Sequence, residues 1–149
     1  MKSILEVTGN QEIIDRINKL KPDTKHLWGI MDVSQMMAHC TVAIKITLGE
    51  IKPQSNIFLK MLGKTFKKKI FAAESFRKNS KTGKEFIITG NKIFEEEKPV
   101  LISYVKKFVE NGFGIITTES HPFFGKLTVE EWDSLMYKHL DHHLKQFGN

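Results

Sequence analysis

The sequence predicts an all-α protein, a four-helix bundle with a long crossover between its second and third helices. Four segments carry apolar residues at the spacing of an amphipathic helix, and each begins or ends at residues that typically cap helices. The chain contains no internal repeat. With 149 residues, of which 40% are hydrophobic and 27% charged, it is long enough to bury a core, and we expect one domain over residues 1–149.

The first expected helix is short and lies before Pro22. Asn10 or Thr8 is expected to cap its N-terminus, because a short polar side chain can accept a hydrogen bond from an unpaired N–H of the first turn. Isoleucine and leucine then recur at helical spacing, and Pro22, which lacks an N–H, prevents the helix from continuing.

The second expected helix covers about residues 33–48. Asp32 is expected to cap it, with Gln35 completing a capping box, and Gly49 marks its end. The segment is apolar nearly all round, which is typical of a helix that packs against several neighbours. We therefore expect it at the centre of the bundle.

Residues 50–94 form the crossover, and so long a connection is not expected to lack structure in a compact domain. We expect a basic helix over about 56–70 and then an irregular segment with a short strand at Glu85 to Thr89. Much of the formal charge of +6 comes from lysines of the basic helix: Lys60, Lys64, Lys67, Lys68 and Lys69. They indicate either the solvated face of an amphipathic helix or a surface for an anionic partner. We favour the solvated face and do not expect nucleic acid, because no nucleic-acid-binding motif accompanies these lysines.

The last two expected helices are clearly marked. Three glutamates at residues 95–97 suit the positive end of the third helix, and Gly112 ends it. Thr128 and Glu131 predict a capping box for the fourth helix, which runs from about Thr128 to Gln146.

The most informative residues are two histidines, His139 and His143, one helical turn apart on the apolar face of the fourth helix. At roughly 100° per residue, Lys138 and Asp141 fall on the opposite face, which is expected to be solvated. Burying an imidazole without a partner costs on the order of 1 to 3 kcal/mol, so the pair calls for a metal ion, a hydrogen-bond network or water. His39, on the inward face of the second helix, is the candidate for a third ligand.

Three inward histidines are the ligand set of a catalytic rather than a structural zinc-like site, because a structural site uses four protein ligands. We expect a divalent ion, zinc or nickel before others, and availability rather than ligand type decides between them. Such an ion lowers the pKa of bound water, polarises a carbonyl or holds a thiolate. The alternative is a bundle without catalysis, in which the histidines form a buried network and the basic crossover binds an anionic partner.

Other residues are weaker candidates. His121 is expected to pack in a turn, and His142 to lie at the surface or behind the ligands. Gln35, one turn before His39, could support the ring of that histidine. Cys40 is expected to be a buried, inert thiol, so catalysis by a cysteine nucleophile is not expected.

Two segments, WGIMDVSQMMAHC and HPFFGKLTVEEWDSLMYKHLDHHLKQFG, resemble the DinB-like superfamily of four-helix bundles, in a branch with an HPFFG loop and a C-terminal HxxxH. The resemblance spans about residues 28–147. In the metal-binding members, one histidine of the second helix and the HxxxH pair of the last helix hold a divalent ion, and by motif position these are His39, His139 and His143. Some members are thiol S-transferases that use bacillithiol or mycothiol, and others are regarded as metal-dependent hydrolases or isomerases. The resemblance therefore implies a metal-dependent S-transferase or hydrolase acting on a small molecule such as a low-molecular-weight thiol.

The remaining expectations concern location and partners. The single cysteine cannot form an intramolecular disulfide, and the N-terminus does not resemble a signal peptide, so a cytoplasmic protein is expected. No run approaches the 18 or so apolar residues of a membrane-spanning helix, so no membrane is expected. Pairing into a homodimer through exposed helix faces is left open. Trp28 is expected to fill the core rather than to stack on a substrate.

Overall fold

The computed structural model describes residues 2–53, 57–73, 75–80, 83–117 and 119–149. These residues are helical or irregular, with no strand among them, so the expectation of an all-α protein is confirmed. The short strand expected at Glu85 to Thr89 is wrong, because a 3₁₀ helix forms at this point instead. The helices, including the two 3₁₀ helices η1 and η2, are α1 (Val7–Lys19), α2 (Val33–Thr47), α3 (Ile57–Ala72), η1 (Lys84–Phe86), α4 (Phe94–Asn111), η2 (Gly112–Ile115) and α5 (Val129–Gln146).

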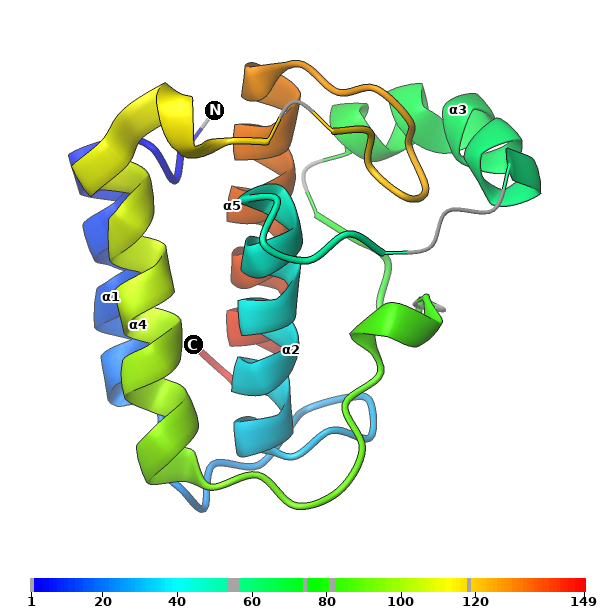
Figure 1. The fold of residues 1–149 in the computed structure, drawn as a ribbon. Helices are drawn as coiled ribbons and strands as arrows, with labels where there is room; N and C mark the ends of the chain where they lie inside the picture. The colour runs from blue at the N-terminus through cyan, green and yellow to red at the C-terminus, as the bar shows by residue number, and fades with distance from the viewer. Residues whose placement is uncertain (1, 54–56, 74, 81–82, 118) are drawn as a thin grey trace.

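Helices α1, α2, α4 and α5 pack against one another (Figure 1). Both α1 and α2 contact α4 and α5, so each of the four helices contacts two of the other three. Helix α3 contacts α5 and lies on the opposite side of the molecule from α1 and α4 (Figure 1). None of the described helices is long and apolar enough to cross a membrane.

Helix α2 is central, as its apolar composition predicts. The predicted capping box is present, because the Asp32 carboxylate accepts from Gln35 N at 2.8 Å and Gln35 Oε1 accepts from Asp32 N at 3.1 Å. Most residues of the helix are buried, His39 among them. The cap sets where the helix starts, and the burial on nearly all sides places the helix among several neighbours.

Helix α5 also begins at its predicted capping box, between Thr128 and Glu131. The face expected to be solvated is covered, however. Lys138 is only 8% exposed, and its Nζ donates to Phe71 O and Ala73 O, both at 2.7 Å. These carbonyls lie at the C-terminal end of α3, where unpaired carbonyls carry a partial negative charge. The solvated position expected for Lys138 is wrong because the crossover helix packs against this face of α5.

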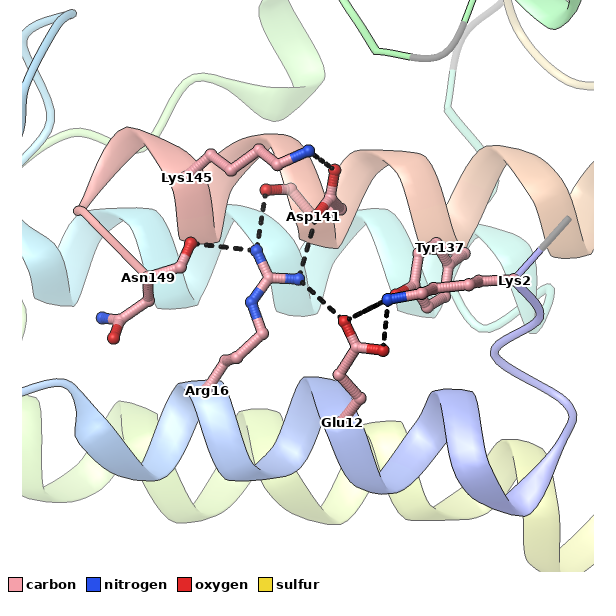
Figure 2. A network of polar contacts seen from close by, with 7 residues as sticks. All are labelled: Lys2, Glu12, Arg16, Tyr137, Asp141, Lys145 and Asn149. Atoms are coloured by element: carbon pink, nitrogen blue, oxygen red, sulfur yellow. Dashed lines mark hydrogen bonds and ion pairs between the residues drawn. The ribbon is translucent and has the colours of Figure 1, made fainter.

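Asp141 is likewise paired rather than solvated (Figure 2). The Arg16 guanidinium of α1 lies 2.9 Å from Asp141 Oδ1 and donates to Asn149 O at 3.0 Å. Lys145 Nζ approaches the other Asp141 oxygen at 2.8 Å. The Asp141 side chain is 14% exposed, and these two cations together with the Arg16 hydrogen bond hold its pKa below the usual range although burial raises it. This ion-pair network joins α1 to α5.

The start of α1 differs from the expectation. The N-cap residue is Glu6, so Thr8 and Asn10 both lie within the helix. Asn10 is buried, and its Nδ2 donates to Ile4 O at 2.9 Å and to Val105 O at 2.8 Å. The capping prediction failed because the asparagine ties the N-terminal segment to α4 instead of closing a helix end.

The basic helix expected over 56–70 is present as α3, although residue 56 and the side chains of Lys60 and Lys64 lie outside the described part of the structure. Lys67 is engaged, because its Nζ contacts Glu131 at 2.8 Å and donates to Lys126 O at 3.1 Å. Lys68 and Lys69 are exposed, as a solvated face requires.

Replacing Lys138 by methionine is expected to lower the free energy of unfolding by about 1.5 to 3 kcal/mol, because two partly buried carbonyls lose hydrogen bonds from a charged donor. Equilibrium urea denaturation measures the change. The matched control is Lys145→Met, which removes an exposed lysine while Asp141 keeps its ion pair with Arg16, and it should cost less than about 1 kcal/mol. Equal losses in the two variants would show that Lys138 does not anchor α3.

Candidate metal centre

The packing of α2 against α5 brings the three predicted ligands together. His39 comes from α2, and His139 and His143 come from adjacent turns of α5. Each ring offers one nitrogen, and these nitrogens all lie within 4.8 Å of one another. His39 Nε2 is 3.1 Å from His139 Nε2, and the ring of His143 lies edge-on to both other rings. Three imidazoles in this arrangement could hold a metal ion.

The tautomer of His39 follows from its backbone partner. Its Nδ1 lies 2.7 Å from the carbonyl oxygen of Phe86, at the end of η1. A carbonyl can only accept, so Nδ1 carries the proton and donates. The lone pair of His39 is therefore on Nε2, which faces the other two histidines.

His143 is oriented by a side chain instead. Its Nδ1 lies 2.8 Å from Gln146 Oε1, and Gln146 Nε2 donates to Trp28 O at 2.7 Å. The Trp28 carbonyl settles which end of the amide is the donor, so Oε1 must accept and His143 Nδ1 must donate. The lone pair of His143 is again on Nε2. Metal-bound histidines usually have such a partner on the second nitrogen.

Gly29 makes the approach of Gln146 possible. Its φ is +85°, and a Cβ built on this backbone would collide with Gln146 Nε2. The neighbouring backbone is tied to the same residue, because Leu27 N donates to Gln146 O at 2.7 Å. Backbone atoms of the loop before α2 thus hydrogen-bond to Gln146 at the C-terminal end of α5.

His139 has no such partner. Its Nδ1 is buried, and no hydrogen-bonding group in the described part of the chain reaches it. If Nε2 carries the proton, Nδ1 is an unpaired acceptor. If Nδ1 carries the proton, an N–H is unpaired and two lone pairs face each other across the 3.1 Å to His39. A cation shared by these lone pairs would remove the repulsion, so the donor set fits a divalent metal ion.

Burial keeps all three rings neutral. It lowers the pKa of His39, and burial together with the neighbouring histidines lowers the pKa of His139 well below its usual value and that of His143 to about 3. Metal ligation needs deprotonated imidazole nitrogens. At neutral pH the lone pairs are therefore available without competition from protons.

One supporting role expected from the sequence, that of Gln35, is not found, and the expectation for Cys40 is met. Gln35 donates to Gly90 O and closes the cap of α2, so it does not contact His39. The ring of His39 is supported instead by the Phe86 carbonyl, which the sequence did not predict. The ring of His143 is supported by Gln146, which lies three residues after it. Cys40 is buried and burial raises the pKa of its thiol, as expected of an inert cysteine.

His121 has a structural role, as expected. Its Nδ1 accepts from Phe123 N and Phe124 N, both at 3.1 Å, and its backbone pairs with Gly125. These bonds close the HPFFG segment into a tight turn. Burial lowers the pKa of His121 to about 4, so the ring stays neutral and keeps accepting at neutral pH.

A family model described as "Protein of unknown function (DUF1569)" matches residues 1–149. Comparisons with curated proteins and with solved structures found no match.

Replacing Gln146 by leucine should weaken metal binding about 10- to 100-fold, because His143 Nδ1 loses its acceptor and the ring loses its fixed orientation. Competition with a chromophoric chelator measures the affinity. Gln35→Leu is the control, since this glutamine caps α2 without touching a ligand ring. An equal loss in the control would mean that Gln146 has no special role.

The protein should lose stability as the pH falls from 6.5 toward 4, partly through His121. The folded pKa of about 4 lies below the ordinary 6.5, so the unfolded chain binds more protons in this interval and unfolding is favoured. The contribution is at most roughly 3 kcal/mol. Thermal unfolding at several pH values tests this, and His121→Asn, which retains an acceptor but cannot titrate, should show a shallower pH dependence. An unchanged slope would contradict it.

Proposed function

The chain belongs to the DUF1569 family, and we propose that it is a metal-dependent enzyme whose divalent ion is held by His39, His139 and His143. The observation that carries the proposal is the convergence of three neutral imidazoles, two of which have their outer nitrogens tied to fixed acceptors. His39 and His143 both carry their protons on Nδ1, so a metal-free network offers their Nε2 lone pairs at most one donor within the group, the Nε2–H of His139, whereas a cation would bind the lone pairs of all three rings.

We also propose that helices α1, α2, α4 and α5 form the four-helix bundle of the DinB-like superfamily, with α3 in the crossover. The mutual packing of these four helices supports this assignment. So does the origin of the candidate ligands, one from the second helix and two from the last, which is the distribution that the resemblance implies. In this proposal residues 1–149 make up one domain.

An ion held by three neutral ligands acts as a Lewis acid and lowers the pKa of a bound water or thiol, so the reaction class we propose is thiol transfer or hydrolysis on a small molecule. Zinc and nickel are the favoured ions. The chain's own part is to orient the ligands: Phe86 O fixes His39, and Gln146 fixes His143.

The nucleophile in this proposal comes from the substrate or from water. The one cysteine of the chain, Cys40, is buried, its Sγ contacts Met36 Sδ at 3.7 Å, and burial raises its pKa. A thiol in this environment stays protonated and is a poor nucleophile.

Metal analysis of untagged protein tests the proposal. Protein purified without chelator, or incubated with zinc or nickel, is expected to hold about one equivalent of a divalent ion. His139→Ala should lose it while keeping its helical circular dichroism, whereas His142→Ala, which alters the neighbouring ring of α5, should retain it. Full occupancy in His139→Ala would refute the ligand assignment, and failure of the unaltered protein to take up either ion would refute the metal site.

A further inference from the structure

Three aromatic rings lie in series between the histidine site and the exposed side chain of Lys78. The ring of Phe76 lies 6.5 Å from that of His139 and 5.9 Å from that of His142. Trp28 continues the series, 5.8 Å from His142, and Lys78 Nζ lies 4.2 Å from the Trp28 ring. The three rings of Phe76, His142 and Trp28 are each partly exposed, and we call them the aromatic path.

Trp28 is therefore not the core residue expected from its type. Its carbonyl fixes Gln146, whereas its ring stays partly exposed beneath Lys78. Large aromatic residues that remain partly exposed next to a candidate site are suited to contact the planar or apolar body of a ligand.

The charges around the candidate site favour an anion. Its three candidate ligands are imidazoles, which carry no negative charge, and the ligand group that the described residues form contains no carboxylate. Among the described residues, Asp141 acts on His142 of the path, but it is already paired with Arg16 and Lys145. A divalent ion in this site would keep its positive charge until a ligand supplied a negative one.

Lys78 adds a second positive charge at the outer end of the path. Within the part of the chain that the structure describes, no carboxylate pairs with it, and its contact is with the face of Trp28. It is close enough to His142 to act on that ring electrostatically. An ammonium held in place over an indole can still donate to an oxygen anion.

We propose that the aromatic path and Lys78 bind a small substrate with a planar or apolar body and an anionic group, such as a carboxylate, at the end remote from the metal. The inference rests on the proposed function, because the inner end of the substrate binds the ion. Phe76 and Trp28 contact the body, and Lys78 pairs with the anionic end.

The test uses cobalt-loaded full-length protein and two probes of one shape, 4-mercaptobenzoate and its neutral amide, 4-mercaptobenzamide. Binding of either thiol to cobalt is followed by its thiolate absorption band, which reports the inner end alone. The benzoate is expected to bind about three- to fivefold more tightly than the amide, the effect of one partly exposed ion pair. Added salt should reduce this preference.

Lys78→Gln should remove the preference while leaving the amide affinity unchanged. Lys92→Gln, which neutralises another exposed lysine, should keep it. If cobalt binds and both probes bind equally to the unaltered protein, or if Lys78→Gln retains the preference, the inference is overturned and the metal site stands. If cobalt does not bind to the unaltered protein, both this inference and the proposed metal site are overturned.

Discussion

The contact between α2 and α5 is the constraint on which the rest of the structure depends. Both helices are buried on nearly all sides, and both start at a capping box that sets their first turn. This contact fixes the three imidazoles within one small volume, and the other helices cover what the pair leaves open. Helix α4 covers α2, α1 packs on α5 through the Arg16 network, and α3 is held to α5 by the buried Lys138.

The candidate site is built from rigid helices but oriented by loops. The helices supply the ring positions, whereas the acceptor that orients His39 comes from η1. Gln146 of α5 orients His143 and is itself held by the Trp28 carbonyl of the loop before α2. No group among the described residues supplies such an acceptor to His139, so the tautomer of this neutral ring is not fixed. The hydrogen bonds to the outer nitrogens of His39 and His143 reduce the free-energy cost of burying polar rings in a bundle core, which otherwise favours apolar side chains.

Local patterns predicted the helices well, since caps and apolar spacing act within a few residues of the chain. The same spacing predicted that His39, His139 and His143 lie on inward faces, and the resemblance to the DinB-like superfamily predicted that they form one site. Other features depend on neighbours that are distant in sequence. The prediction that Lys138 is solvated failed because α3 packs over this residue. The prediction that Asn10 caps a helix failed because its side chain donates to carbonyls of other segments. The role of Phe86 could not be read at all, because any residue type supplies a backbone carbonyl.

Gly29 illustrates how far the demands of the candidate site extend. It touches no ligand ring, yet any side chain at this position would push on Gln146, and its φ of +85° already disfavours other residues. The effect would pass from Gln146 to His143 through a single hydrogen bond. Mutational tolerance around this centre is therefore not set by direct contact alone: a loop position two contacts away from a candidate ligand is restricted as well.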